Sequence, residues 1–292
     1  MSQLALGCVQ FGLPYGITNR DGLMSEDSIR EILVQSRELE IDLLDTASSY
    51  GNAESVLGQI GVSDFDVVTK LPYNKPDNVS LIQWMLREFS ASLVRLRVDN
   101  AHGLLFHNIG QVFVESPAMV RAAIDHVKST QQVTNIGVSV YSPVDLDMVF
   151  KVFKPDIVQL PMNAFDRRFE KSGWLDRLNS LEVEVHVRSI YLQGLMLAPM
   201  SDLPLRFRHW EQDFQRWHDF VKSLNVSPTA ASIAAVRSPG ISRLVVGVQS
   251  LDQLDELVSG YETSSTIEVP DFNIDDLRLL LPTMWANNND TP

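Results

Sequence analysis

Eight short apolar runs that alternate with amphipathic stretches of helical period predict a single (β/α)8 TIM barrel. The runs are almost continuously apolar, as in Leu244-Val245-Val246 and Ile157-Val158-Gln159-Leu160, which is typical of parallel strands covered on both faces. The chain has 292 residues, and eight strand–helix units of about 35 residues fit a closed barrel better than an open sheet. No Gly-x-Gly-x-x-Gly follows a predicted strand, so a doubly wound dinucleotide fold is not supported.

The predicted elements follow one another in regular order along the chain. The strands are expected at 4–9, 41–46, 65–71, 102–107, 133–139, 156–161, 183–189 and 242–247. The helices are expected at 26–39, 53–60, 78–94, 116–128, 143–152, 173–180, 208–224 and 250–259. Thr229 to Val236 predicts an extra helix before the last strand, and the acidic tail 262–292 carries one helical patch at 275–285. We expect one domain over residues 1–292, with the tail crossing a barrel face.

Helix-start signals support these assignments. Ser25 is suited to cap the first helix, and Glu26 and Asp27 suit the positive end of its dipole. Ser142-Pro143 places a capping serine before a proline at the first helical position. The first helix and the helix after the fifth strand therefore have defined starts.

Composition and charge narrow the functional classes. Apolar residues make up 45% and charged residues 21% of the chain, as in ordinary globular proteins. The net charge of −13 argues against a nucleic-acid or anionic-membrane surface. Cys8 is the single cysteine, so an internal disulfide and a CxxC zinc signature are excluded, and a reducing, cytoplasmic setting is expected. We expect no signal peptide, no membrane span and no metal site.

Four proton-transferring side chains stand at the ends of three consecutive predicted strands. Asp45 ends the second strand and Tyr50 lies in the turn after it, while Lys70 and His107 end the third and fourth strands. Period-two alternation lets Asp45, Lys70 and His107 point into the barrel mouth. Active sites of such barrels lie at the carboxyl ends of the strands. Each residue alone would be ordinary, but their coincidence at one rim predicts a catalytic site.

These residue types suit proton transfer coupled to another reaction. Asp45 can supply the counter-charge that a buried Lys70 ammonium needs. We expect Lys70 to lower the Tyr50 pKa from about 10 towards neutrality. Tyr50 could then exchange a proton with a carbonyl oxygen that a neutral His107 orients.

At these residues the chain resembles the aldo-keto reductase superfamily. The segment Asp45-Thr46-Ala47-Ser48-Ser49-Tyr50-Gly51-Asn52-Ala53-Glu54 is similar to the family signature Asp-Thr-Ala-x-x-Tyr-Gly-x-(Ser/Ala)-Glu. The resemblance continues in order through Val68-Thr69-Lys70, Leu104-Leu105-Phe106-His107 and Ile136-Gly137-Val138-Ser139 to Val246-Gly247-Val248. The stretch from Val187 to Gly194 resembles a bacterial subset often encoded near surface-polysaccharide genes.

The resemblance implies NAD(P)H-dependent reduction of an aldehyde, ketone or sugar carbonyl, or oxidation of the alcohol, with Tyr50 as general acid. Lys70 would adjust the Tyr50 pKa, Asp45 would hold Lys70, and His107 would orient the carbonyl. The cofactor-binding positions that it implies are Gly7, Cys8, Val9, Asp45, Ser139, Gln159, Arg188, Gln193, Gly194, Gly247, Gln249, Ser250 and Gln253. Within this set, Cys8 is expected to be a packing residue and not a reactive thiol.

Three departures from the family pattern concern the cofactor. Val140 follows Ser139 where the family often has Asn, which removes one polar contact. Arg188 stands where a ring often stacks on nicotinamide, so it could stack there or pair with a neighbouring acid. No Lys or Arg occurs from Leu244 to Leu277, where basic residues commonly hold the 2′-phosphate of NADP. We therefore expect NADP or NAD as cofactor, with weak NADP discrimination or a preference for NAD(H).

Two rival functions stay open on the sequence. The first is a non-catalytic module on the same barrel that senses a dinucleotide or binds a partner. The second is a lyase or isomerase with Lys70 as Schiff base, which Asp45 disfavours. For the reductase, the varied rim side chains allow a polar ligand with an apolar face, such as a modified sugar. The candidate rim residues are Tyr15, Tyr73, Trp84, Asn163, Phe165, Arg206 and Trp210.

Overall fold

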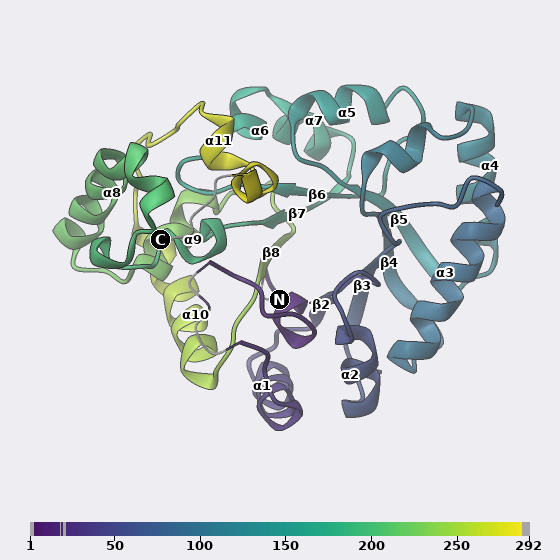
Figure 1. Ribbon diagram of the computed structural model, residues 1–292, viewed down its shortest axis with the longest axis horizontal. Coiled ribbons are helices and arrows are strands. Elements are labelled where there is room, and N and C mark those ends of the chain that lie inside the picture. The colour runs from purple at the N-terminus through teal and green to yellow at the C-terminus, as the bar shows by residue number, and fades with distance from the viewer. Residues whose placement is uncertain (1–2, 18, 20–21, 288–292) are drawn as a thin grey trace.

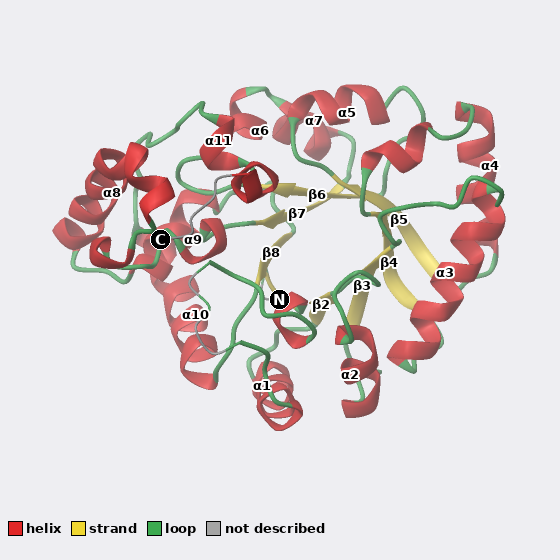
Figure 2. Cartoon of the chain, in the orientation of Figure 1, coloured by secondary structure: helices red, strands yellow, loops and turns green. Residues whose placement is uncertain are grey.

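Eight parallel strands close into a barrel in which each strand pairs with the next along the chain and β8 pairs with β1. The computed structural model describes residues 3–17, 19 and 22–287. The strands are β1 Leu4–Gly7, β2 Leu43–Asp45, β3 Asp66–Lys70, β4 Ala101–Phe106, β5 Val133–Ser139, β6 Ile157–Pro161, β7 Glu184–Arg188 and β8 Arg243–Val246. Figures 1 and 2 show this ring of strands surrounded by helices. The predicted (β/α)8 barrel is confirmed.

Most helices lie outside the ring and connect one strand to the next. They are α1 Glu26–Glu38, α2 Ala53–Ile60, α3 Leu81–Leu96, α4 Pro117–Ser129, α5 Pro143–Val149, α6 Arg168–Lys171, α7 Trp174–Ser180, α8 Glu211–Leu224, α9 Pro228–Val236, α10 Leu251–Thr263 and α11 Leu277–Leu280. The expected caps are present: Ser25 Oγ accepts from the Ser28 backbone N–H, and Ser142 caps α5 with Pro143 in its first turn.

The barrel encloses an apolar layer that separates its two ends. This inner layer consists of Ala5, Leu43, Val68, Leu105, Ile157 and Val245, all at least nine-tenths buried. The larger core lies between the strands and the outer helices. Because the interior is filled, the barrel has no channel, and each end forms its own polar site.

The register of the sheet places the predicted catalytic residues at the carboxyl ends of the strands. Asp45, the last residue of β2, pairs with Gly7 of β1 and Val68 of β3. Lys70 ends β3 two residues beyond Val68, and it pairs with Leu105 of β4, two residues before His107. Strand pairing therefore brings Asp45, Lys70 and His107 to one rim.

The opposite end holds a polar cluster at the starts of β4 and β7. Both carboxylate oxygens of Glu184 are engaged, one with His102 Nε2 at 2.9 Å and the other with His186 Nε2 at 2.7 Å. Arg243 Nη1, at the start of β8, donates to Asp42 at 2.7 Å. We call Glu184, His102 and His186 the N-terminal-end cluster.

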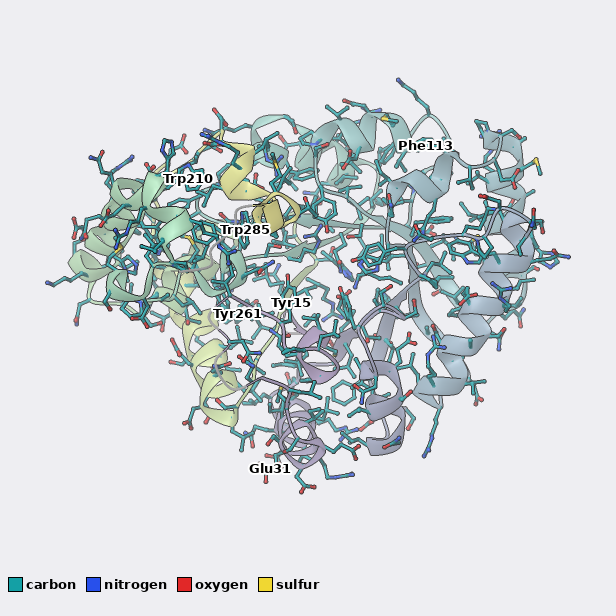
Figure 3. The ribbon with its side chains drawn as sticks, in the orientation of Figure 1. Tyr15, Glu31, Phe113, Trp210, Tyr261 and Trp285 are labelled. Carbon is teal, nitrogen blue, oxygen red and sulfur yellow. The ribbon has the colours of Figure 1, made fainter. Side chains whose placement is uncertain are left out.

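An aromatic lobe lies beside the barrel and is built by the segment after β7 together with the tail. It packs Phe207 on Trp285 with ring centroids 5.0 Å apart, and Trp217 on Phe272 at 5.5 Å. Figure 3 shows Trp210 and Trp285 on this side, near α11. The lobe gives the polar tail a second core of its own.

Helix bounds differ from the sequence prediction where helical turns tighten. The helix predicted at 208–224 starts as a 3-10 turn, Leu205–Trp210, and becomes α8 at Glu211. The patch predicted at 275–285 forms α11 and a 3-10 turn at Pro282–Asn287. Residues 288–292 of the predicted tail lie outside the described residues. Within the described part, no helix is long and apolar enough to cross a membrane.

Candidate active site

A cavity of about 670 Å³ opens at the carboxyl ends of the strands. Asp45, Tyr50 and His107 lie in its wall, and the wall extends along the β7 and β8 ends to α10. Its size falls in the usual range for a small-molecule or cofactor site. Tyr15 is another wall residue, and Figure 3 shows it at the lower left edge of the ring of strands, close to the N-terminal segment.

Beneath the cavity floor, Asp45 and Lys70 form a buried ion pair. Lys70 Nζ donates to Asp45 Oδ1 at 2.6 Å and to the Thr46 carbonyl at 3.0 Å. The Lys70 side chain is fully buried and that of Asp45 is 5% exposed. The second Asp45 oxygen accepts from Gln159 Nε2 at 2.6 Å. Both charges therefore have defined partners, as a buried pair requires.

Tyr50 is placed by a tight turn between β2 and α2. The Tyr50 backbone N–H donates to the Ala47 carbonyl at 3.0 Å. Gly12 lies so close to this turn that a Cβ at position 12 would be 2.0 Å from the backbone carbonyl oxygen of Tyr50. Only glycine fits at position 12. Lys70 Nζ lies 5.0 Å from the Tyr50 ring centroid. The turn thus holds the phenol above the buried ammonium.

The pKa of Tyr50 departs from the sequence prediction. Burial, followed by the Asp45 carboxylate, raises the pKa of Tyr50 well above its ordinary value, although the Arg188 charge opposes this. The predicted net lowering of the Tyr50 pKa is wrong in this structure, because burial and the Asp45 carboxylate, which also pairs with Lys70, together disfavour the phenolate. Tyr50 is therefore protonated at neutral pH, which is the form that can donate a proton.

His107 lies between two tyrosine rings. Its ring stacks on Tyr73 at 4.2 Å between centroids and meets the Tyr50 ring edge-on at 5.7 Å. His107 Nε2 and the Tyr73 hydroxyl share a hydrogen bond of 3.1 Å. Burial, and then the Lys70 charge, lowers the pKa of His107 to about 3. The imidazole is therefore neutral, as the sequence predicted.

Glu54, the last residue of the matched signature segment, holds the elements around the site. Its carboxylate accepts from Thr69 Oγ1 at 2.5 Å and from Arg95 Nε at 2.7 Å. These bonds join α2 to β3 and α3. Because Thr69 directly precedes Lys70, Glu54 fixes the strand end that presents the lysine.

Nearly all of the predicted cofactor-binding residues line the cavity. Those in the wall are Gly7, Cys8, Val9, Asp45, Ser139, Gln159, Arg188, Gln193, Gly194, Gly247, Gln249 and Gln253. Gln159 Oε1 is buried and has no hydrogen-bond partner in the described part of the chain. An unpaired buried acceptor beside the proton-transfer set fits an amide donor such as the nicotinamide carboxamide. Burial raises the pKa of the Cys8 thiol, which fits the expected packing role.

The start of α10 differs from the prediction in one residue. Ser250 is absent from the cavity wall formed by the described residues, and its Oγ caps α10 by accepting from the Gln253 N–H at 3.2 Å. Gln253 Oε1 in turn accepts from the Gln249 N–H at 2.8 Å. Two backbone donors at this helix start are therefore already used within the chain. Asp252 stands in the first turn and Glu256 lines the cavity.

Arg188 ends β7 and stacks on a side chain of the protein itself. Its guanidinium carbon lies 4.4 Å from the Tyr141 ring centroid, and Nη2 donates to the Val140 carbonyl at 3.0 Å. Of the two roles left open by the sequence, an ion pair with a neighbouring acid is not seen among the described residues. Val140, which stands where the family often has Asn, thus anchors Arg188 through its backbone carbonyl.

Of the seven candidate rim residues, Tyr15 and Tyr73 line the cavity. Trp84 and Phe165 are buried core residues, Trp210 belongs to the aromatic lobe, and Asn163 caps a turn by accepting from the Phe165 N–H. Arg206, like these four, is absent from the described wall. Trp84 lies in α3, and Arg206 and Trp210 lie in the 3-10 turn Leu205–Trp210, so these side chains are held away from the cavity by helical segments.

Sequence reasoning missed several wall residues, three of which contact groups already described. Gln10 lies against Gly247, Tyr141 lies under Arg188, and Thr229 donates to Glu256 Oε1 at 2.7 Å. Tyr141 follows the fifth strand directly, so its place after a strand end was a usable signal. Gln10 and Thr229 carry no comparable signal, because a 3-10 turn and an added helix bring them to the wall.

Comparisons with known proteins agree with this geometry. The sequence model of the Aldo/keto reductase family matches residues 3–270. An aldo-keto reductase from Bacillus halodurans, solved in its holo form, is similar with a TM-score of 0.72 and 20% identity, covering 89% of this chain and 87% of that one. A putative aldo-keto reductase from Pseudomonas aeruginosa has a TM-score of 0.67 and 19% identity, covering 91% of each chain. At these identities the structural likeness shows the fold alone.

Proposed function

The chain belongs to the Aldo/keto reductase family and is therefore an NAD(P)-dependent oxidoreductase, and on that premise we propose that Tyr50 is the general acid in the reduction of an aldehyde, ketone or sugar carbonyl. The observation that supports this most strongly is the arrangement of the four side chains at the mouth of the barrel. The buried Asp45–Lys70 pair lies beneath a protonated Tyr50, with a neutral His107 beside it.

Each of the four side chains has a distinct proposed task. Tyr50 donates its hydroxyl proton to the carbonyl oxygen as negative charge develops there. The Lys70 ammonium stabilises the phenolate that remains, and Asp45 keeps Lys70 charged and in place. His107 donates the one N–H of its neutral ring to the carbonyl oxygen and orients it, while its low pKa excludes the imidazolium as the acid.

The cofactor is proposed to lie along the elongated cavity. When bound, nicotinamide supplies the hydride that adds to the carbonyl carbon. Gln159 Oε1 and Ser139 would hold its carboxamide, and the Gly7 and Gly247 backbones would admit it closely because neither carries a Cβ. The far end of the cavity would take the rest of the dinucleotide.

Replacing the acid tests the proposal. Tyr50→Phe removes only the hydroxyl, so kcat for reduction of a carbonyl panel should fall about 10³-fold, within the usual range for general acid catalysis. The dissociation constant for NADH, measured by fluorescence, should change little. Tyr261→Phe serves as control, because this tyrosine lies on α10 and hydrogen-bonds Gln3. Unchanged kcat in Tyr50→Phe would refute the assignment, and absent turnover with tight dinucleotide binding would favour the non-catalytic module.

We further propose that NADH serves at least as well as NADPH. The α10 start carries Asp252, and the adjacent wall carries Glu256 and no lysine or arginine among the described residues near it. A 2′-phosphate there would lack charge-assisted hydrogen bonds. We expect kcat/KM with NADH to exceed that with NADPH by about 10-fold, and Gln249→Arg to narrow this gap where Gln249→Met does not. A strong NADPH preference in the wild type would contradict the proposal.

A further inference from the structure

The wall of the cavity contains one cation that the described residues do not neutralise. Asp45 is matched by Lys70 at 2.6 Å, and His107 is neutral. Glu256 lies at the α10 end and accepts a hydrogen bond from Thr229. Arg188 is charged but forms no ion pair with any described residue, although the whole chain has a net charge of −13. An isolated cation in a cavity of so acidic a protein calls for an anion.

Neutral groups hold the Arg188 guanidinium in place. Nη2 donates to the Val140 carbonyl at 3.0 Å, Nη1 donates to Ser189 Oγ at 3.2 Å, and the guanidinium plane lies over Tyr141. Arginine has five N–H donors, so further donors remain for a ligand. The orientation is already fixed, so little entropy is lost when a carboxylate or phosphate oxygen binds.

The position of Arg188 favours a ligand at the reacting end of the cavity. It ends β7 on the same rim as Tyr50 and His107, and its charge is among the causes that shift the pKa of both. The α10 end, which follows the neighbouring strand β8, is acidic: Asp252 lies in the first turn of α10 and Glu256 lines the wall. The cation therefore accompanies the proton-transfer groups and not the far end of the cavity.

We propose that Arg188 binds a carboxylate carried by the carbonyl substrate, so that the protein acts on oxo acids in preference to neutral carbonyl compounds. The rings of Tyr15, Tyr73 and Tyr141 border the cavity and provide apolar surfaces for the body of such a substrate. This inference rests on the proposed function, because it assigns the substrate class of the same site.

Matched substrates and variants test the proposal. We compare kcat/KM for 4-carboxybenzaldehyde with 4-nitrobenzaldehyde, and for glucuronate with glucose, in the wild type and Arg188→Gln. Arg188→Gln should lower kcat/KM for each carboxylate about 10-fold to 100-fold more than for its neutral partner, the range of a charge-assisted hydrogen bond. Arg188→Lys, which keeps the charge, should retain part of the preference and guards against a folding defect of the first variant.

A control variant separates this effect from the loss of any arginine. Arg177→Gln removes a guanidinium that also lies 4.4 Å from an aromatic ring, that of Trp174, but is outside the cavity wall. Arg177→Gln should leave kcat/KM for all four substrates unchanged. Equal losses for carboxylate and neutral substrates in Arg188→Gln would overturn the proposal. So would an increase in the NADH or NADPH dissociation constant without a change in preference, because the anion would then be a cofactor phosphate.

A binding measurement keeps this test independent of catalysis. With NADH present, benzoate should raise the unfolding midpoint of the wild type more than benzamide does, and Arg188→Gln should abolish the difference. Equal stabilisation by the two compounds in the wild type overturns the carboxylate subsite even if Tyr50→Phe has confirmed the reductase. A benzoate preference with unaltered turnover in Tyr50→Phe would instead retain the subsite and refute the proposed acid.

Discussion

Each end of the barrel holds a carboxylate between two partners, buried for Asp45 and half-buried for Glu184, but the two carboxylates serve different purposes. At the mouth, Asp45 accepts from Lys70 and Gln159, while at the opposite end Glu184 accepts from His102 and His186. The apolar inner layer separates the two groups. Each end leaves one buried atom of its partners unpaired among the described residues, Gln159 Oε1 at the mouth and His186 Nδ1 at the opposite end, but at the mouth Asp45 and Gln159 also border the cavity. One arrangement thus prepares a reaction, and the other holds strands together.

The same geometry can therefore be structural or chemical, depending on what lies beside it. A carboxylate with both oxygens engaged across strands stabilises either end of the barrel, provided that its partners are charged or donate hydrogen bonds. Only the mouth places a protonated phenol and a neutral imidazole next to that carboxylate. Substitutions at the two carboxylates should separate these roles.

The largest expected effect is on catalysis at the mouth. Asp45→Asn keeps the shape but leaves the Lys70 ammonium without its counter-charge, so the proton on Lys70 and the position of Gln159 are no longer secured. We expect kcat to fall about 100-fold, an effect comparable to the loss of one transition-state hydrogen-bond donor. Steady-state kinetics with saturating NADH measure it. A variant that unfolds more readily but retains wild-type kcat would show that the mouth carboxylate is structural too.

A smaller effect, on stability, is expected at the other end. Glu184→Gln removes the charge that two histidine N–H groups share, and we expect a loss of about 2 kcal/mol, or about 4 °C in the unfolding midpoint at pH 6. The value of kcat should stay within about twofold of the wild type, since the inner layer separates Glu184 from the cavity. Glu182→Gln, an exposed neighbour, is the control. A kcat loss as large as that of Asp45→Asn would break the comparison.

The smallest expected effect is the change with pH of the stability difference between the wild type and Glu184→Gln. Burial opposes ionisation of Glu184, but hydrogen bonds from His102 and His186 outweigh it and hold its pKa well below the ordinary value. The Glu184 hydrogen bond, against the effect of burial, raises the pKa of His102; the charges of Glu184 and Asp66 add to this rise, and that of Arg243 opposes it. The contribution of Glu184 to the free energy of unfolding is lost as the pH falls below the ordinary pKa of a glutamate. The contribution of His102 is lost as the pH rises through its raised pKa.

The difference in unfolding midpoint between wild type and Glu184→Gln should therefore be greatest near pH 6 and shrink towards pH 9 and pH 4. Thermal scans in buffers of constant ionic strength measure it. A difference that grows steadily from pH 6 to pH 9 would contradict the assigned ionisation states.

Sequence reasoning reached the mouth because its signal was local. Asp45, Lys70 and His107 each close an apolar run, and period-two alternation assigned their direction. The N-terminal-end cluster gave no such signal, since polar residues at strand starts are usually exposed. His102 and Glu184 come from β4 and β7, and only closure of the barrel brings them together.

The direction in which the Tyr50 pKa shifts could not be predicted from the sequence either. The lysine beside the phenol could be predicted, but the degree of burial and the competing hold of Asp45 on that lysine could not. The two opposing contributions depend on three-dimensional surroundings. For the same reason, Tyr141 and Gln10 joined the cavity wall without having been predicted.

Glu54 has a consequence for anyone who wishes to move this chemistry to another scaffold. Its carboxylate ties Thr69, the residue before Lys70, to Arg95 of α3. A graft that copied only the acid, phenol, amine and imidazole would leave the third strand end free to shift. We therefore count Glu54, Thr69 and Arg95 within the smallest transplantable unit, because tolerances in designed sites are a fraction of an ångström.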